Sequence, residues 1–229
     1  MGGHRAGTDA ILLAASVPPD FAGVLADAGA GVGTAGLAAG LSGPGRELIL
    51  IEREAELAAL AERNLAANGL TGRVVQADLL DPKSRRQAGL ADGVADLVIS
   101  NPPFLDPGEG RASPDAVRAR AHVFDEPDGI ERWIRACVAI GAAQAEIILI
   151  HRADRLADLL AALKGRTGGI RVIPVHPRGD EDATRVLIRA KKGSRAPLSL
   201  RPPLVLHQPD GRFTPQVEAI HRGEGHILW

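Results

Sequence analysis

The stretch that joins the first apolar run to the first helical pattern reads AGVLADAGAGVGTAG, residues 22–36. We expect a strand over residues 22–26 and a helix over 34–41, with a glycine-rich loop between them. Glycine lets a backbone turn sharply and approach a ligand closely. In open α/β sheets, ligands bind in the crevice at the carboxyl ends of the strands. The stretch therefore predicts a strand–loop–helix unit that binds a nucleotide-like cofactor.

Apolar runs and helical patterns continue to alternate after this unit. The expected strands cover residues 46–51, 73–77, 94–99 and 146–150, and the expected helices cover 53–68, 129–141 and 153–164. The helix over 53–68 has the clearest pattern, because its leucines recur at helical spacing and Asn68-Gly69 supplies a C-terminal stop. A repeated strand–helix–strand order predicts an open, largely parallel sheet covered by helices.

The end of the sheet departs from this order. Residues 169–175 and 184–190 are two strand-like runs separated only by a polar loop, and a connection this short requires an antiparallel pair. We therefore predict an α/β fold with a doubly wound, Rossmann-like sheet of seven strands, mostly parallel, with an antiparallel last strand. Residues 1–229 form a single domain in this interpretation. Residues 194–229 are expected to be a tail packed on that domain, with an extended piece at 204–206 and a short helix from Pro215.

Composition narrows the class of protein. The chain has 229 residues, of which 45% are hydrophobic, and its apolar runs are short and broken by charges. We therefore expect no membrane span, no secretory signal and a cytoplasmic protein, either a monomer or a weak dimer. The single cysteine, Cys137, excludes an internal disulfide, and its apolar helical surroundings favour a buried position over a nucleophile. The histidines show no metal-ligand spacing, so we predict no metal site.

Charge is unevenly distributed along the chain. The formal net charge is −1, but residues 1–150 hold 13 Lys+Arg against 20 Asp+Glu, whereas residues 151–229 hold 14 against 8. A small net charge argues against a general nucleic-acid binder. A basic C-terminal part is nevertheless able to contact phosphates, although ordinary surface variation produces such a split too.

A second informative stretch is Ser100-Asn101-Pro102-Pro103-Phe104, which directly follows the strand expected over 94–99. Two consecutive prolines end a strand because neither can donate a ladder hydrogen bond, and the first restricts Asn101 to an extended conformation. An amide oxygen, a proline carbonyl and a stacking ring suit one task, which is to grip a planar substrate through its NH2 group. The alternative is that the prolines only terminate the strand and that Phe104 belongs to the core.

The acidic residues at the strand ends indicate which cofactor is bound. Gly31, Gly33 and Gly36 fit the dinucleotide fingerprint, which alone is a weak signal. Asp27 precedes Gly29 by two residues, where an anion would repel a pyrophosphate but suits the cationic groups of S-adenosylmethionine.

Two further acids stand at the ends of the next strands. Glu52 closes the strand over 46–51, where a carboxylate can accept hydrogen bonds from ribose hydroxyls, although acids also favour helix starts. Asp78 follows the strand over 73–77 and is a candidate acceptor for the adenine amino group, or else a turn residue.

Together these stretches resemble the motifs of class I S-adenosylmethionine-dependent methyltransferases. The residues that carry the resemblance are Asp27, Gly29, Gly31, Gly33, Glu52 and the Asn101–Phe104 signature of enzymes that methylate amino groups. Residues 5–15, 118–122 and 204–214 further resemble the bacterial tRNA1(Val) adenine N6-methyltransferase family. Phe104 stands where well-known enzymes of this type have tyrosine. The chain also begins close to the Gly7-Thr8-Asp9 segment, so we expect part of a substrate-side lid to be absent.

The resemblance implies a function and further site residues. Thr8 and Asp9 would lie against the methionine end of S-adenosylmethionine, within an N-terminal segment, 1–22, that covers the cofactor. The substrate would be RNA, most plausibly tRNA, methylated at N6 of an unpaired adenine, because an unpaired base costs little to present. Arg111, Arg118 and Arg120 would contact its phosphates, or else lie on a solvated helix.

Three other functions use the same stretches. A glutamine N5-methyltransferase of the release-factor type grips a side-chain amide with the same motif, and a ribosomal RNA guanine N2-methyltransferase leaves the motif unchanged. A catalytically silent S-adenosylmethionine-binding module is the third, and it has no need of an intact Asn101–Phe104 signature.

Overall fold

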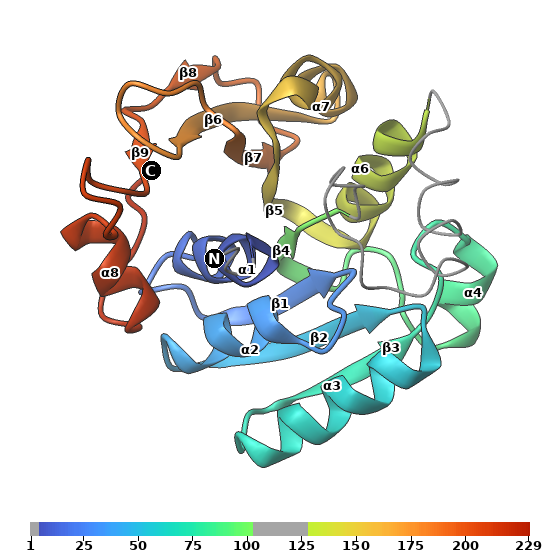
Figure 1. Ribbon diagram of the computed structural model, residues 1–229. Helices are drawn as coiled ribbons and strands as arrows, with labels where there is room; N and C mark the ends of the chain where they lie inside the picture. The colour runs from blue at the N-terminus through green and yellow to red at the C-terminus, as the bar shows by residue number, and fades with distance from the viewer. Residues whose placement is uncertain (1–4, 103–127) are drawn as a thin grey trace, which may run out of the picture.

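The computed structural model describes residues 5–102 and 128–229, which form an α/β fold around one mixed sheet (Figure 1). The strands are β1 (Gly23–Ala28), β2 (Arg46–Glu52), β3 (Gly72–Gln76), β4 (Ala95–Ser100), β5 (Gly141–Arg152), β6 (Thr167–His176), β7 (Arg185–Lys192), β8 (Ser199–Leu200) and β9 (Leu204–Val205). The helices are α1 (Arg5–Ala15), α2 (Thr34–Leu41), α3 (Ala55–Ala67), α4 (Pro82–Gln87), α6 (Gly129–Ile140), α7 (Leu156–Leu163) and α8 (Pro215–His221).

The strand order confirms the expected doubly wound topology. In the described part of the chain, the sheet runs β3-β2-β1-β4-β5-β7-β6-β8, and β9 pairs with β6. Strands β1 to β5 are parallel to one another, whereas β7 is antiparallel to both β5 and β6. The hairpin predicted from the short polar connection is therefore present. Two short strands, β8 and β9, extend the sheet beyond the seven that we predicted.

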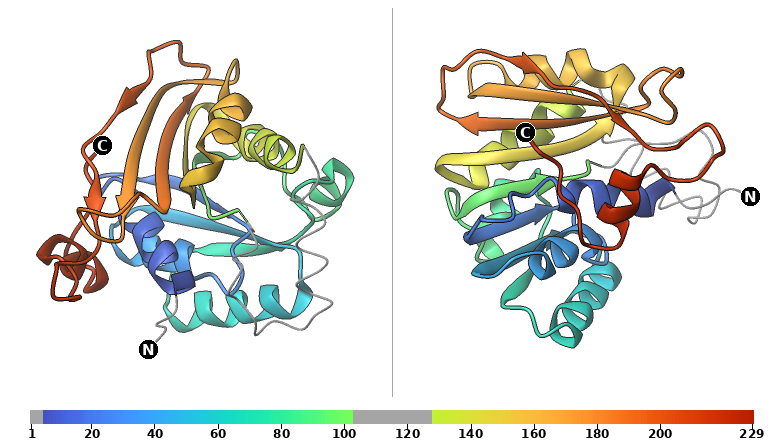
Figure 2. Two further views of the ribbon diagram at one scale, coloured as in Figure 1. Left: turned by 45° about the horizontal axis from the view of Figure 1, so that its top comes forward. Right: turned by 90° about the vertical axis from the view of Figure 1, so that its left-hand side faces the viewer.

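Alternating side chains on the strands bury two separate cores, one on each face of the sheet. On β2, Leu48 and Leu50 pack towards α1, α2 and α3, whereas Ile49 and Ile51 pack towards α6 and α7. Successive side chains of a strand point to opposite faces, so a strand buried on both sides needs an unbroken apolar run. The views in Figure 2 show the blue and cyan helices on one side of the sheet and the yellow helices on the other.

Several helices and strands differ in extent from the sequence-based expectations. Residues 5–15, which we expected only to lie over the cofactor, form helix α1. Helix α4 was not predicted, although Asp81 caps it by accepting a hydrogen bond from the Lys83 N–H and Pro82 occupies its first turn. Strand β5 begins at Gly141, directly after α6, and is longer than the predicted 146–150.

The C-terminal residues contact helix α1. Val217 and Ile220 of α8 are buried in the same core as the apolar face of α1. The Ile227 N–H donates to the Ala15 carbonyl at 2.8 Å, and the indole Nε1 of Trp229 donates to the Ser16 carbonyl at 2.8 Å. Within the described residues, no helix combines the length and the apolar character needed to cross a bilayer.

Candidate functional site

The carboxyl ends of four neighbouring parallel strands bring most of the predicted site residues to one edge of the sheet. Strands β3, β2, β1 and β4 lie side by side and point the same way. A cleft of about 240 Å³ opens at this edge. Gly29, Gly31, Glu52, Asp78 and Asn101, which the sequence analysis selected, all line it.

The glycine loop forms one wall of this cleft. Gly29, Gly31 and Gly33 have φ values of 79°, 58° and 91°, in the left-handed region that favours glycine. The N–H groups of Gly29 and Ala30 donate to the Ile51 carbonyl at 3.0 and 2.9 Å, which ties the start of the loop to β2. A side chain at Gly29 would also meet the ring of Trp133, because its Cβ would lie 3.0 Å from Cζ2.

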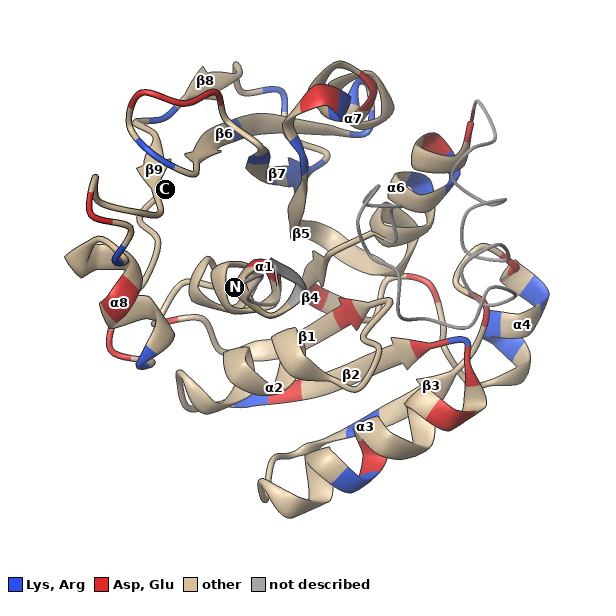
Figure 3. Ribbon diagram, in the orientation of Figure 1, with Lys and Arg blue, Asp and Glu red and all other residues tan. Residues whose placement is uncertain are grey.

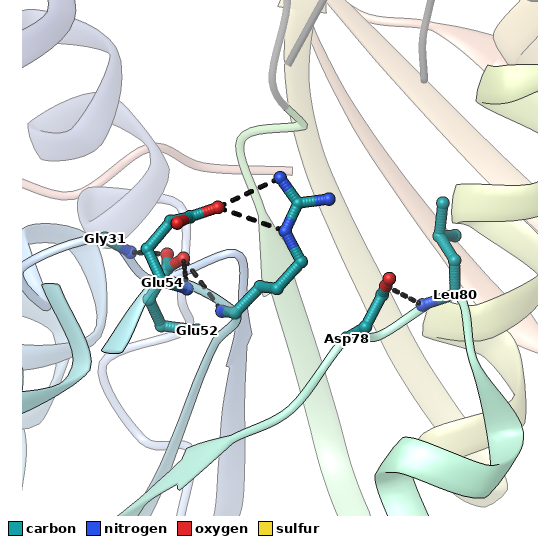
Figure 4. Close-up of polar contacts among 6 residues, drawn as sticks. Gly31, Glu52, Glu54, Asp78 and Leu80 are labelled. Atoms are coloured by element: carbon teal, nitrogen blue, oxygen red, sulfur yellow. Dashed lines mark hydrogen bonds and ion pairs between the residues drawn. The ribbon is translucent and has the colours of Figure 1, made fainter. Parts of the chain in front are cut away.

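Glu52 is held by backbone donors from two directions. Its Oε2 accepts from the Gly31 N–H at 2.8 Å, and its Oε1 accepts from the N–H groups of Arg53 and Glu54 at 2.8 and 2.9 Å (Figure 4). An ionised carboxylate offers about four lone-pair sites, so these bonds leave room on Oε2 for a further donor. The carboxylate is thus fixed at the cleft and able to accept a bond from a ribose hydroxyl.

Asp78 makes the hydrogen bonds of a turn residue and also lines the cleft; its contact with an adenine stays a prediction. Its Oδ1 accepts from the Leu80 N–H at 2.9 Å, as a turn residue would, and its own N–H donates to the Ser84 hydroxyl at 3.0 Å. It nevertheless lines the cleft (Figure 4). The surrounding lining is apolar, from Ile51, Leu57, Ala77, Leu79 and Leu80. Flat apolar walls with an acceptor at the edge fit a purine ring bearing an amino group.

Asp27 lies beneath the glycine loop and outside the lining of the cleft. It is 2% exposed, and its Oδ2 accepts from the Gly36 N–H at the start of α2 at 2.8 Å. Burial raises the pKa of this carboxyl to about 7, against the lowering effect of the Gly36 hydrogen bond, and the negative charge of Glu52 raises it further. Its contact with cationic groups of the cofactor stays a prediction.

Asn101 lines the cleft with an unsatisfied acceptor. Its Oδ1 is buried and makes no hydrogen bond to the described residues. Buried acceptors are nearly always satisfied, so this oxygen is available to a donor from a ligand, and its contact with a substrate stays a prediction. Pro102 follows it and is buried. The other predicted residues of this region, Pro103, Phe104, Arg111, Arg118 and Arg120, lie outside the described residues.

Thr8 and Asp9 lie on helix α1 and are not among the residues that line the cleft. Asp9 is buried, and its Oδ2 accepts from Nε of Arg185, at the start of β7, at 2.9 Å. This ion pair joins α1 to the sheet at the edge where the cleft opens, since β7 runs opposite to β5. The contact of Thr8 and Asp9 with the cofactor is not tested by this geometry and stays a prediction.

The sequence analysis missed Trp133 and Ser100. Trp133 of α6 lines the cleft, and its Nε1 donates to the Ser100 hydroxyl at 3.0 Å. The same hydroxyl donates to the Ala28 carbonyl at 2.7 Å. The helix expected over 129–141 contained Trp133, but the helical pattern does not show which strand end a side chain reaches. Cys137, on the same helix, is buried with its pKa raised to about 12, as expected for an unreactive thiol.

The charge around the cleft suits a cationic ligand. Acidic residues mark the carboxyl ends of β1 and β2 (Figure 3). The basic Arg53 in the lining pairs with Glu54 at 3.0 Å, and on β7 Arg189 pairs with Glu146 at 2.6 Å and Lys192 donates to the Gly141 carbonyl. In the part of the chain that the structure describes, no three His, Cys, Asp or Glu side chains come together as metal ligands.

The sheet order, the glycine loop and the acceptors at the strand ends together fit S-adenosylmethionine. The loop admits a ligand close to its backbone, Glu52 can accept from a ribose, and the apolar wall beside Asp78 accommodates an adenine. The cationic sulfonium agrees with the acidic strand ends. Asn101 lines the same cleft.

Comparisons with known proteins agree with this geometry. The model of the methyltransferase small domain family matches residues 5–120. The tRNA1(Val) (adenine(37)-N6)-methyltransferase of Porphyromonas gingivalis is 29% identical over 223 residues, which cover 93% of this chain and 85% of that enzyme. Ribosomal RNA small subunit methyltransferase C of Mannheimia succiniciproducens is 34% identical over 95 residues, which cover 42% of this chain and 26% of that enzyme.

One solved structure is similar along nearly the whole chain. It is protein Atu636 from Agrobacterium tumefaciens, described as a predicted O-methyltransferase. Its sequence is 36% identical, its TM-score is 0.79, and the match covers 96% of this chain and 98% of that one.

Proposed function

This chain belongs to the methyltransferase small domain family of S-adenosylmethionine-dependent methyltransferases, and we propose that it methylates N6 of an unpaired adenine in tRNA. The buried, unsatisfied Oδ1 of Asn101 in the cleft is the observation that carries this proposal. An oxygen that needs a donor at this place fits a substrate with an NH2 group. The name of the Porphyromonas gingivalis relative, an adenine N6-methyltransferase acting on tRNA, supports the same choice.

The residues at the cleft account for the chemistry. S-adenosylmethionine, when bound, supplies a methyl group that its sulfonium already activates. The Asn101 Oδ1 and the Pro102 carbonyl would each accept one hydrogen of the target NH2, which turns the nitrogen lone pair towards the methyl group and stabilises the positive charge that develops. The N–CH3 bond would form as the S–CH3 bond breaks, the sulfur would leave as a neutral thioether, and the methylated nitrogen would lose one proton to water. Positioning therefore contributes more than acid–base catalysis. Phe104 would stack on the target base.

The cofactor and the RNA have separate sets of contacts in this proposal. Glu52 holds the ribose, Asp78 faces the adenine, and Gly29 and Gly31 let the methionine portion lie against the backbone. Segment 1–22 covers the methionine end through Thr8 and Asp9. The tail, residues 194–229, completes the single domain by packing on α1. Arg111, Arg118 and Arg120 contact phosphates near the target base.

Transfer to nitrogen accounts for the site better than transfer to oxygen. A hydroxyl acceptor must lose its proton to a base for efficient attack. The Asn101 amide is not a base, and the cleft carboxylates Glu52 and Asp78 belong to the proposed ribose and adenine sites. An acceptor pair formed by Asn101 and Pro102 matches the two hydrogens of an NH2 group. Guanine N2 of ribosomal RNA is the second candidate, because the partial relative from Mannheimia succiniciproducens is a ribosomal RNA methyltransferase.

The test is to incubate the protein with labelled S-adenosylmethionine and separate pools of undermethylated tRNA, ribosomal RNA and ribosome-associated protein. Mass spectrometry of the products should identify N6-methyladenine in tRNA. Finding N2-methylguanine in ribosomal RNA would replace adenine by the second candidate. Label in protein alone would refute the RNA substrate and favour glutamine methylation.

Variants then test the role of Asn101. Asn101→Ala should lower transfer by about 100-fold or more, because it removes an acceptor aimed at the developing charge. Its affinity for S-adenosylmethionine should stay close to that of the wild type. Asn68→Ala is a matched control, since Asn68 lies at the exposed end of α3 and its amide bonds only the Asn64 carbonyl. Equal transfer by both variants would refute the role of Asn101.

A further inference from the structure

We propose that Ser100 and Trp133 are positioning residues that set the spacing between the glycine loop and Asn101. The Ser100 hydroxyl is the centre of the bridge, because it donates to the Ala28 carbonyl at 2.7 Å and accepts from Trp133 Nε1 at 3.0 Å. Ala28 directly precedes Gly29, and Ser100 directly precedes Asn101. Each of the two bridged strands is therefore linked at the residue directly before a cleft residue, Gly29 on β1 and Asn101 on β4. The inference rests on the role proposed above for Asn101.

The bridge begins where the backbone pairing of β1 and β4 ends. The paired residues of these two strands are Leu25 with Leu97, Ala26 with Val98 and Asp27 with Ile99. At the next position, the link between the strands is the Ser100 side chain bonding the Ala28 carbonyl. Ser100 is fully buried, so water does not compete for this bond. A side chain thus extends the connection between the strands to the edge of the cleft.

Trp133 completes the bridge from the side of helix α6. A hydroxyl has one donor and rotates to suit its partners, and the indole N–H can only donate. Trp133 therefore occupies the hydroxyl as an acceptor, and the Ser100 proton is left for the Ala28 carbonyl at 2.7 Å; the Cys137 thiol also bonds Ser100. The indole ring also lies close to Gly29, whose Cβ, if present, would be 3.0 Å from Cζ2 and 3.1 Å from Cη2. Trp133 contacts the start of the glycine loop and the strand end that carries Asn101.

A loss of this bridge should affect transfer more than binding. In-line transfer depends on a reactant separation near 3–3.5 Å, and a misplacement of about 1 Å can cost about 100-fold in rate. Most cofactor contacts, such as Glu52 and the apolar wall at Leu79 and Leu80, do not involve the bridge. Ser100→Ala and Trp133→Phe should therefore lower kcat by about 10-fold to 100-fold, while the Kd for S-adenosylmethionine changes by less than about threefold.

A matched control separates positioning from a general loss of stability. Thr167, at the start of β6, also has a buried hydroxyl that donates to a carbonyl, that of Leu163 at 3.1 Å, and it does not line the cleft. Thr167→Val removes this hydroxyl and should leave kcat within about twofold. Ser100→Thr retains the hydroxyl and should recover most of the activity that Ser100→Ala loses.

The experiment measures three quantities for each variant. The first two are kcat and the RNA KM with labelled S-adenosylmethionine. The third is the Kd for S-adenosylmethionine from isothermal titration calorimetry, which needs no tryptophan reporter and therefore applies to Trp133→Phe as well. The double variant Ser100→Ala/Trp133→Phe should lose no more activity than Ser100→Ala alone, since both remove one bridge. Independent, additive losses, or unchanged kcat in the single variants, would overturn the inference.

Two further results distinguish this inference from the proposed function. If Asn101→Ala abolishes transfer while Ser100→Ala and Trp133→Phe do not, only the positioning role is refuted. If Asn101→Ala retains transfer, the proposed function is refuted.

Amide hydrogen exchange without substrate supplies an independent readout. Exchange at Gly29, Gly31 and Asn101 should be faster in Ser100→Ala than in Thr167→Val. Equal exchange in the two variants would overturn the bridge even if no substrate were found.

Discussion

Replacing Asp27 by asparagine tests how the buried carboxyl beneath the glycine loop responds to the cofactor. In the structure, Asp27 has a pKa raised to about 7, chiefly by burial. A nearby cationic ligand stabilises the ionised form. If the cationic groups of S-adenosylmethionine act on Asp27, binding should therefore release a proton from it near neutral pH. Asparagine keeps the shape and the acceptor for the Gly36 N–H but cannot ionise.

The size of the effect follows from the pKa. With a pKa of about 7, roughly a tenth of Asp27 is ionised at pH 6 and roughly nine tenths at pH 8. If the ionised form binds the cofactor, the Kd of the wild type should be about tenfold lower at pH 8 than at pH 6. The α-amino group of the cofactor also titrates near this pH, but it loses its positive charge as the pH rises, which should weaken binding. This effect is the same for the wild type and for Asp27→Asn, so the difference between the two proteins reports Asp27.

The same pKa predicts a pH dependence of stability. Because the folded-state pKa lies above the unfolded value of 3.8, the unfolded chain loses this proton first as the pH rises. The free energy of unfolding should then fall between about pH 4 and pH 7, by about 4 kcal/mol in total, and stay lower above pH 7. Asp27→Asn should remove this part of the pH dependence and be relatively more stable at pH 8.

Isothermal titration calorimetry between pH 6 and pH 8, in buffers of different ionisation enthalpy, measures the affinity and the released protons. Urea unfolding at pH 5 and pH 8 measures the stability. Asp182→Asn, at an exposed position between β6 and β7, is the control and should behave as the wild type. Identical pH profiles for the wild type and Asp27→Asn, in both binding and unfolding, would refute the reasoning.

Three other substitutions test separate parts of the structure. Glu52→Gln should weaken binding of S-adenosylmethionine about 10-fold or more, measured by calorimetry, because it removes a charged acceptor held by backbone N–H groups; unchanged affinity would contradict the ribose role. Asp9→Ala should lower the free energy of unfolding by about 3–5 kcal/mol, because it leaves Arg185 buried without this partner. The double variant Asp9→Ala/Arg185→Met should lose less free energy of unfolding than Asp9→Ala alone, as measured by urea unfolding. Gly72→Ala should be strongly destabilising in a thermal scan, since its Cβ would lie 2.3 Å from the Leu48 carbonyl oxygen, and a Tm equal to that of the wild type would show that β3 can shift.

The sequence was sufficient for those parts of the fold that depend on local pattern. The apolar run over 94–99 predicted β4, which the structure places at Ala95–Ser100. The short polar connection before residue 184 predicted the antiparallel β7. Glu52, Asp78 and the glycines of the loop were found because parallel strands end at a common edge, so their position in the chain fixes their place in the cleft.

Other features depend on contacts between distant segments. Strand β8 is a two-residue pairing with β6, and nothing in Ser199-Leu200 alone distinguishes it from a loop. The bond of Trp133 to Ser100 joins residues 33 positions apart, and the helical pattern gives only the buried face. The Asp9 contact with Arg185 spans 176 positions. In contrast, Asp81-Pro82 at the start of α4 was a local signal that could have been recognised.

The contacts between helix α1 and the C-terminal residues have a consequence for the order of folding. Ser16 and Trp229 are 213 positions apart, and Ala15 and Ile227 make a similar link. During synthesis, α1 emerges first but meets α8 and residues 227–229 only after the whole sheet has been made. Contacts of such long range are formed late and slow folding. Helix α1 also packs on α2 and on the sheet, so it can dock early, whereas its contacts with α8 and residues 227–229 should form last.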